Sequence, residues 1–277
     1  RAYRPWGIIL FERNCLSEDQ IKILTDSIKK IYGTEIPILI DQEGGRVSRL
    51  NFKGAFKFPS ATKLFNLRKN FAEIGDRIFQ LNYKLISTYI KKLGINVNSI
   101  PVLDIPDENE SGIIGDRSFS NDREIVASYG SEVIDILNNN GVAPIIKHMP
   151  GHGRADVDSH LGLPYVHSKK SDMSASDFYP FKFNKDCVLG ITAHIIYYDM
   201  LCCYNQTYKI ENMNHFLHLF DYPIYFKYTY ESFVNVEINS TPEINNTYET
   251  ILNATNSQLH KHIMIPYIDS WLYVNSK

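Results

Sequence analysis

The chain has 277 residues, which is enough for one large domain or two small ones, and a (β/α)8 barrel of about 250 residues just fits within it. Its 29 Lys and Arg residues face 31 Asp and Glu residues, a formal net charge of −2. No basic excess therefore exists to neutralise a nucleic-acid backbone. Hydrophobic residues make up 44% of the chain, which is enough to form a core and excludes general disorder.

The sequence shows no membrane segment and no export signal. Its longest apolar runs, such as residues 36–40, are far too short to span a bilayer, and residues 1–11 contain no small-residue cleavage site. The four cysteines, which lack metal-binding spacing, are Cys15, Cys187, Cys202 and Cys203. We therefore expect reduced thiols in a cytoplasmic protein.

Upstream of residue 200, short apolar runs alternate with amphipathic segments. The predicted strands, each nearly continuous in apolar residues, are 7–11, 36–40, 95–103, 142–146 and 189–193. The predicted helices are 17–32, 70–93, 122–139 and a segment around 178–184. This repetition of strand and helix indicates a parallel sheet that is covered by helices.

Two of these helices can be described in more detail. Ser17 is a candidate N-cap with Gln20 at the capping-box position. The apolar residues that follow it at helical spacing are Ile21, Leu24, Ile28 and Ile31. In the helix 70–93, the residues on or near one face are Phe71, Ile74, Ile78, Leu81, Leu85, Thr88 and Leu93.

The predicted fold class is α/β, as a (β/α) TIM-type barrel that is incomplete. No G-x-G-x-x-G follows the first strand, so a doubly wound dinucleotide-binding sheet lacks its signature. Each predicted strand ends in a polar or charged residue, and ligand sites of barrels lie at those ends. We expect Asp41, Asp104, His148 and His194 to converge on one face.

The chain changes character after about residue 200. All 15 glycines lie between Gly7 and Gly190, although turns and helix ends normally require glycine. Residues 201–277 are instead rich in Asn, Tyr, His and Thr. We therefore divide the chain into a partial barrel domain, 1–200, and a divergent tail, 201–277, which we expect to pack poorly without supplying three regular strands.

The densest group of reactive side chains lies in residues 147–160. Pro150, Gly151 and Gly153 forbid a continued helix, so this segment is predicted as a loop after a strand. Its reactive members are Lys147, His148, His152, Asp156, Asp158 and His160. Three interpretations stay open: an acid–base or substrate-binding unit with an Asp orienting an imidazole, a metal site, or a surface loop without a role.

A second group is D-Q-E-G-G-R-V-S-R, residues 41–49. A carboxylate at a strand end, paired glycines and two arginines suit a hydroxyl-rich or anionic ligand, because a guanidinium can bridge two oxygens. The alternative is a salt-bridge network at the top of a barrel. A third group, I-G-D-R-S-F at 114–119, is weak by itself because Asp-Arg pairs are common on surfaces.

Six segments together carry a specific resemblance. In chain order they are GIILFERN (7–14), IDQEGGRVSRL (40–50), PVLDI (101–105), IGDRSFS (114–120), KHMPGHGRADVDSHLGLP (147–164) and ITAHIIY (191–197). With them the chain resembles the bacterial β-N-acetylglucosaminidases, or β-hexosaminidases, of glycoside hydrolase family 3 that act in peptidoglycan recycling. The resemblance covers residues 5 to 200, and its most specific part is the fifth segment.

The resemblance implies roles for individual residues. His160 matches the general acid/base of the family, and Asp158 matches the carboxylate that holds and tunes it. The positions that match sugar-binding residues are Asp41, Arg49, Arg117, Lys147 and His148. No cofactor and no metal is implied. The implied protein is a cytoplasmic monomer that acts on a small sugar of the GlcNAc-anhydro-MurNAc type, without nucleic-acid or membrane partners.

The implied reaction is retaining hydrolysis of terminal β-linked N-acetylglucosamine. An Asp attacks the anomeric carbon, while the acid/base first protonates the leaving oxygen and later activates water. A His with an ordinary pKa near 6.5 can serve as both acid and base near neutral pH.

The chain departs from the family at the nucleophile, which normally lies in an S-D-D-L-like motif after the strand that follows A-H-x-x-Y. No such motif follows Tyr197, and the aspartates further on are Asp199, Asp221 and Asp269. The family's segment before G-I-I-L-F is also absent, which predicts loss of the first strand. Two functions stay open: an active glycosidase, and a catalytically inactive remnant that at most binds sugar.

Overall fold

The structure is a computed structural model that describes residues 5–106, 113–155, 164–197 and 199. From Ile9 onward, these residues belong to one compact unit. Residues 156–163, which include Asp158 and His160, and residues 201–277 lie outside the described residues. The expectations for the tail and the boundary at residue 200 therefore stay predictions.

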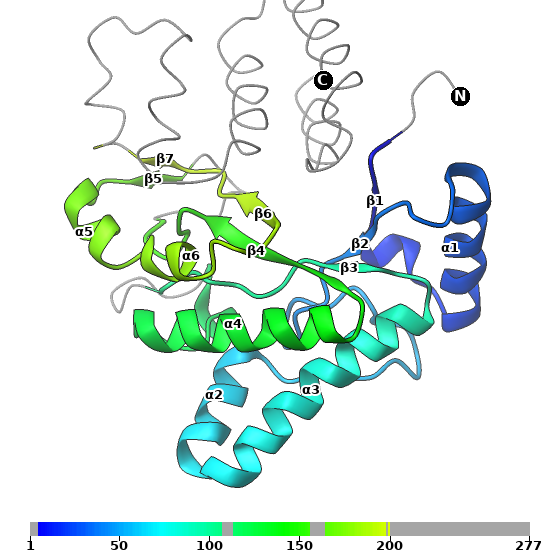
Figure 1. Cartoon of the computed structure of the whole chain (residues 1–277), viewed down its shortest axis with the longest axis horizontal. Coiled ribbons are helices and arrows are strands. Elements are labelled where there is room, and N and C mark those ends of the chain that lie inside the picture. The colour runs from blue at the N-terminus through cyan, green and yellow to red at the C-terminus, as the bar shows by residue number, and fades with distance from the viewer. Residues whose placement is uncertain (1–4, 107–112, 156–163, 198, 200–277) are drawn as a thin grey trace, which may run out of the picture. The chain divides into compact units, whose positions relative to one another are not determined.

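A curled sheet of five strands forms the centre of this unit (Figure 1). In spatial order its strands are β1 (Ile8–Leu10), β2 (Ile38–Ile40), β3 (Val97–Asn98), β4 (Ala143–Met149) and β6 (Leu189–Thr192). The pairs β2 with β3, β3 with β4 and β4 with β6 are parallel. The predicted α/β class and the incomplete TIM-type barrel are confirmed.

Helices connect these strands and cover the sheet (Figure 1). They are α1 (Glu18–Tyr32), α2 (Ala61–Asn70), α3 (Ala72–Lys92), α4 (Arg123–Asn139), α5 (Lys170–Ala175) and α6 (Tyr179–Phe183), with 3-10 turns η1 (Glu12–Asn14) and η2 (Gly115–Arg117). The sequence did not predict α2, α5 or the short parallel pair of β5 (Tyr165–Val166) and β7 (Ile196–Tyr197). None of the described helices is long and apolar enough to cross a bilayer.

The predicted N-cap of α1 is present, but the Gln20 side chain bonds to the residue before the N-cap and not to the N-cap itself. The Ser17 hydroxyl accepts a hydrogen bond from the Gln20 backbone N–H at 3.2 Å. The Gln20 side chain accepts one from the Leu16 N–H at 3.0 Å, one residue before the N-cap. The first bond satisfies an N–H of the first turn, which has no partner within the helix, and the second bond ties the residue before the N-cap to the same turn.

Of the apolar face that the sequence indicates for residues 70–93, only Leu93 is buried, and the other members are exposed. The side that packs on the core carries Phe79, Tyr83, Ile86 and Ile90, all buried. Phe79 and Tyr83 lie edge to face with ring centroids 5.0 Å apart. Since α3 has apolar residues over more than half its circumference, spacing alone does not identify the core face. Ile31 of α1 is likewise 63% exposed rather than buried.

Two predicted strands differ in length from the observed ones. The run 95–103 forms a ladder only at β3, and Val102 then makes an isolated parallel bridge to Lys147. Pro101 lies between these contacts, and a proline lacks the N–H that a continuous ladder requires. By contrast, β4 continues through Met149, so Lys147 and His148 belong to the strand and not to the loop that follows it.

Candidate functional site

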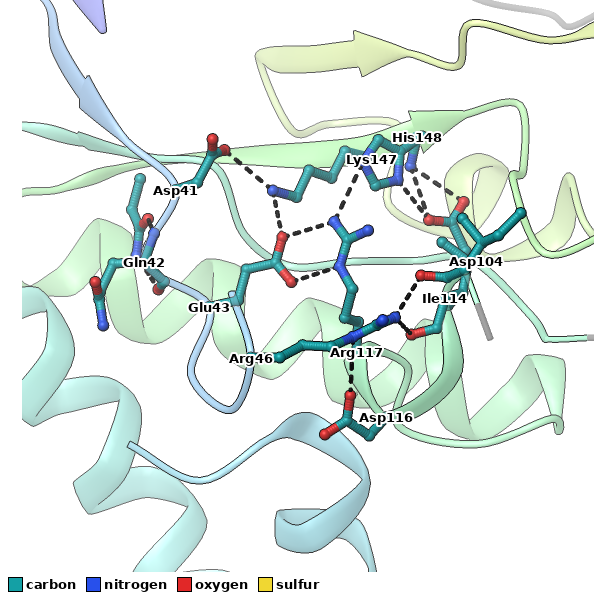
Figure 2. Close-up of polar contacts among 12 residues, drawn as sticks. Asp41, Gln42, Glu43, Arg46, Asp104, Ile114, Asp116, Arg117, Lys147 and His148 are labelled. Carbon is teal, nitrogen blue, oxygen red and sulfur yellow. Dashed lines mark hydrogen bonds and ion pairs between the residues drawn. The ribbon is translucent and has the colours of Figure 1, made fainter. Parts of the chain in front are cut away.

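A cluster of charged side chains lies at the carboxyl ends of the central strands (Figure 2). Asp41 and Glu43 follow β2, whereas Lys147 and His148 are near the end of β4. Arg117 is the last residue of η2. We call the charged network the set of Asp41, Glu43, Asp104, Arg117, Lys147 and His148.

Lys147 joins two carboxylates in the interior of this network. Its Nζ lies 3.2 Å from Oδ1 of Asp41 and 2.6 Å from Oε1 of Glu43. All three side chains are buried. On the other side, Oδ2 of Asp41 accepts a hydrogen bond from Nη2 of Arg49 at 3.1 Å. Asp41 thus lies between two cations.

Arg117 connects Glu43 to His148, as Figure 2 shows. Its Nε and Nη2 donate to the two oxygens of Glu43 at 2.9 and 2.8 Å, which is the fork-to-fork geometry of a strong Arg–carboxylate pair. The same Nη2 lies 3.4 Å from Nε2 of His148. Glu43 therefore holds both Lys147 and Arg117.

Asp104 fixes the orientation of His148. Oδ2 of Asp104 lies 2.6 Å from Nδ1 of His148, and Oδ1 accepts hydrogen bonds from the backbone N–H groups of His148 at 3.2 Å and His152 at 2.7 Å. An ionised carboxylate only accepts, and a guanidinium only donates. Nδ1 therefore carries the proton toward Asp104, and Nε2 presents its lone pair toward Arg117.

Burial and partners together set the protonation states. Burial lowers the pKa of His148 to about 4, although the Asp104 carboxylate opposes this shift. Burial favours protonation of Asp41, but Lys147 and Arg49 outweigh it and hold the pKa of Asp41 far below its usual range. The pKa of Glu43 is also lowered, because Lys147 and Arg117 outweigh its burial.

The charges of the site are balanced. Three cations, Lys147, Arg49 and Arg117, are matched by the carboxylates Asp41, Glu43 and Asp104, while His148 is neutral near pH 7. No cation of this set is left to attract an anion. The arrangement therefore suits a neutral ligand with several hydroxyl groups better than a phosphate or a carboxylate.

The loop after β2 is fixed by its own hydrogen bonds and by glycine. The Gln42 side-chain oxygen accepts from the N–H groups of Arg49 at 3.1 Å and Leu50 at 3.3 Å. Gly44 has a φ of 105°, and a Cβ there would lie 2.3 Å from the Pro59 carbonyl oxygen. This tight turn places Asp41 and Glu43 on one side of Lys147.

The loop after β4 is held close to the segment that carries Asp104. A Cβ on Gly153 would lie 1.6 Å from the Ile105 carbonyl oxygen, so only glycine fits. The Tyr197 hydroxyl donates to the Gly151 carbonyl at 2.8 Å, and Nε of Arg154 donates to Asp177 at 2.8 Å. These contacts fix the point from which the chain continues to residue 156.

The structure brings all five predicted sugar-binding residues into contact with the charged network. Asp41, Lys147, Arg117 and His148 are members of it, and Arg49 binds Asp41. Their contact with a sugar stays a prediction. Asp158 and His160 lie outside the described residues. The expected convergence holds for Asp41, Asp104 and His148, and for His194 it stays a prediction.

Two members, Glu43 and Asp104, have no predicted role in the site, although Asp104 is expected to lie on the same face as Asp41 and His148. Each has a signal in the sequence: Glu43 lies two residues after Asp41 in D-Q-E-G-G, and Asp104 ends the run P-V-L-D. The salt-bridge network that was the alternative interpretation of residues 41–49 is also present. Asp116 pairs with Arg46 at 3.3 Å instead of its neighbour Arg117.

The sequence leaves open a metal site in residues 147–160 and offers Asp199 among the aspartates that follow Tyr197. Among the described residues, no group of three His, Cys, Asp or Glu side chains is placed to hold a metal ion. Asp158, which belongs to the group at residues 147–160 for which a metal site is one interpretation, lies outside that part of the chain. The Asp199 carboxylate accepts a hydrogen bond from the Lys170 N–H at 2.8 Å, at the first residue of α5.

The sheet, the helices around it and the charged network at its strand ends define a barrel-type protein, and ligand sites of barrels usually lie at those strand ends. Residues 5–201 match the glycosyl hydrolase family 3 N-terminal domain, and the chain belongs to that family.

Curated relatives carry the name beta-hexosaminidase. The chain is 34% identical to the Neisseria meningitidis protein over 194 residues, which are 69% of this chain and 53% of that protein. It is 33% identical to the Hydrogenovibrio crunogenus protein over 176 residues, which are 63% of this chain and 48% of that protein. The chain thus spans about half the length of these relatives.

Solved structures show the same fold. The crystal structure of NagZ from Neisseria gonorrhoeae in complex with N-trifluoroacetyl-D-glucosamine has a TM-score of 0.64 and 33% identity, covering 70% of this chain and 58% of that one. A family 3 β-N-acetylglucosaminidase from Paenibacillus has a TM-score of 0.63 and 31% identity, covering 70% of this chain and 37% of that one.

Proposed function

We propose that residues 5–200 form the sugar-binding part of a retaining β-N-acetylhexosaminidase. The ligand is the terminal β-linked N-acetylglucosamine of peptidoglycan-derived muropeptides. The observation that carries this proposal is the charged network at the carboxyl ends of the strands, in a chain whose relatives are named beta-hexosaminidase. The sugar bound to the gonococcal relative supports the same ligand class.

The chemistry of the charged network suits a sugar. An ammonium has three donors and a guanidinium has five, and the bonds of Lys147 and Arg117 to Glu43 do not use them all. Asp41 can accept from a sugar hydroxyl, because its pKa is held far below neutral pH. These groups are oriented by one another before a ligand arrives, which reduces the cost of ordering them on binding.

The proposed acid–base pair is His160 with Asp158. In the first step of a retaining hydrolysis, protonated His160 would give its proton to the glycosidic oxygen while the bond from that oxygen to the anomeric carbon breaks and the oxygen of a nucleophilic Asp bonds to the carbon. In the second step, His160 takes a proton from water, whose oxygen attacks the anomeric carbon and releases the Asp. Asp158 orients the imidazole in both steps.

The nucleophile is the group that this chain does not supply in recognisable form. Asp199 is engaged with the backbone of α5, and Asp221 and Asp269 lie outside the described residues. We therefore propose that the chain as written binds the sugar without hydrolysing it. An acid/base cannot form the covalent intermediate alone.

Two measurements on the full chain test these proposals separately. Calorimetric titration with N-acetylglucosamine should show binding, which Asp41→Asn should weaken at least tenfold. Asp26→Asn, the same chemical change at an exposed aspartate of α1, should leave binding within about twofold. Absence of binding by the parent chain would refute the sugar site.

Hydrolysis of an aryl β-N-acetylglucosaminide near neutral pH tests the second proposal. The parent and His160→Ala should release the aryl alcohol at the same rate, at equal concentration. Clear turnover by the parent, abolished in the variant, would show that a tail aspartate such as Asp269 acts as nucleophile. That result would overturn the proposal of binding without hydrolysis and leave the sugar site standing.

A further inference from the structure

Helix α3 presents an exposed row of apolar side chains away from the sugar site. We call this row the α3 seam: Phe71, directly before the helix, with Ile74, Ile78, Leu81 and Leu85. These side chains are 60, 63, 38, 54 and 45% exposed. Five large exposed apolar residues on one helix are unusual for a face that meets only water, and such patches indicate an interaction site.

The spacing of the α3 seam is that of a helix–helix interface. Its members are separated alternately by three and four residues, which is the a/d pattern of a coiled coil. At 100° per residue the row covers an arc of only about 80° and extends for about 20 Å. A helix that lies on a membrane usually has a wider apolar face, so the narrow row favours a single helix as its partner.

The α3 seam is held rigidly in place by the rest of the helix. The opposite side of α3 packs into the core through Phe79, Tyr83, Ile86 and Ile90, which are all at most 3% exposed. At the end of α3 the Lys92 ammonium lies 2.9 Å from Glu18 of α1. A partner would therefore meet a preformed surface, with little ordering of this chain on binding.

Basic residues border the α3 seam on its polar side. Arg77 and Lys84 are exposed and seven residues apart, so they repeat with the period of the seam. Within the described part of the chain, neither forms an ion pair with a carboxylate. Asp76, the acidic neighbour of Arg77, is already paired with Arg68.

These charges disfavour a second copy of the chain as the partner. Two α3 seams packed antiparallel would place Arg77 of one copy opposite Lys84 of the other, and like charges across a helix pair are destabilising. A helix with acidic residues at the facing positions would instead form ion pairs with both.

We propose that the α3 seam is the docking surface for an amphipathic α-helix of a partner protein, with apolar a and d positions and Glu or Asp beside them. Such a helix buries the five apolar side chains and neutralises Arg77 and Lys84. This binding is independent of the sugar site, since none of these residues belongs to the charged network.

The test uses the full chain and two synthetic helical peptides of three heptads each. Both peptides carry Leu at a and d; one has Glu at the flanking positions and the other has Lys. Fluorescence anisotropy of the labelled peptides should show that the Glu peptide binds at least tenfold tighter than the Lys peptide. The double variant Ile78→Gln with Leu81→Gln should lose at least tenfold in affinity.

Matched variants separate docking from general stickiness. Ile23→Gln with Ile31→Gln changes two apolar residues of α1 that are 68 and 63% exposed, and it should leave peptide affinity unchanged. Arg77→Glu with Lys84→Glu should reverse the preference, so that the Lys peptide binds tighter. Circular dichroism checks that each variant is folded.

Three results would overturn the proposal. The first is equal affinity for the two peptides, or a preference that the charge-reversed variant does not change. The second is no peptide binding together with sedimentation of the chain on phosphatidylglycerol vesicles, which would show a membrane surface. The third is a concentration-dependent dimer of the parent chain that the Ile78→Gln and Leu81→Gln changes abolish, which would show self-association.

Discussion

The substitution Asp104→Asn tests the assignment of His148 as a neutral imidazole with its proton on Nδ1. The amide has nearly the same shape as the carboxylate, so the change removes one charge and one acceptor without creating a cavity. Asp104 is fully buried and accepts from the His148 ring and from two backbone N–H groups. An asparagine can accept with only one of its two terminal atoms.

No orientation of the introduced amide satisfies all of these groups. With its oxygen toward the two backbone N–H groups, its NH2 faces Nδ1 of His148 and forces the ring proton to Nε2, where it meets the Arg117 guanidinium. With its oxygen toward the ring, the NH2 faces the two backbone donors. In each case a buried donor loses its partner, at a cost of about 1–3 kcal/mol. Loss of a charge-assisted bond costs a similar amount, so we expect a total of about 3 kcal/mol.

Urea unfolding at pH 7 should show this loss of about 3 kcal/mol in the free energy of unfolding. Nitrogen-15 NMR of the histidine ring should show the proton on Nδ1 in the parent and on Nε2 in the variant, or a mixture. Asp177→Asn should lower stability but leave the His148 tautomer unchanged. An Asp104→Asn protein that keeps the proton on Nδ1 and the parent's stability would refute the assignment.

Three further outcomes follow from the same geometry. Lys147→Met leaves Asp41 and Glu43 buried without their shared cation, and urea unfolding should show a loss of about 3–5 kcal/mol. Gly153→Ala should abolish N-acetylglucosamine binding in calorimetry, because the added Cβ would overlap a carbonyl oxygen of the neighbouring segment. Stability should fall between pH 6.5 and about 4, because the unfolded chain protonates His148 at about 6.5 whereas the folded chain resists until about 4. Protonation of His148 should lower the free energy of unfolding by about 3 kcal/mol over this range. A His148→Gln variant measured over the same pH range should not show this loss.

The sequence predicts the order of strands and helices well because each buried strand is a short, nearly unbroken apolar run. It predicts the core face of α3 poorly. The row with Phe71, Ile74 and Leu81 and the row with Phe79 and Tyr83 both have helical spacing, but only the second row reaches the core. Amphipathic spacing identifies a helix, but it cannot tell a core face from a docking face when both are apolar.

The candidate site is predictable to the extent that its residues lie in motifs at strand ends. Asp41, Lys147 and His148 fall in such motifs, whereas the role of Glu43 depends on a contact with Arg117 that lies 74 residues away. Only the tertiary structure shows that one carboxylate holds two cations. The tautomer of His148 is a further property of this kind, because it depends on two partners from two other segments of the chain.

The energetics of the charged network favour a ligand as the reason for its presence. Removing charged groups from water costs several kcal/mol for each ion, and replacing a buried ion pair by apolar residues of similar volume is often neutral or stabilising. A barrel that needed only stability at this place could therefore fill it with apolar side chains, as the core beneath it does. The charged network instead holds its donors and acceptors in fixed positions at the strand ends. Because that arrangement can accept a hydroxylated ligand whether or not a nucleophile is present, we expect binding and hydrolysis to be separable in this chain.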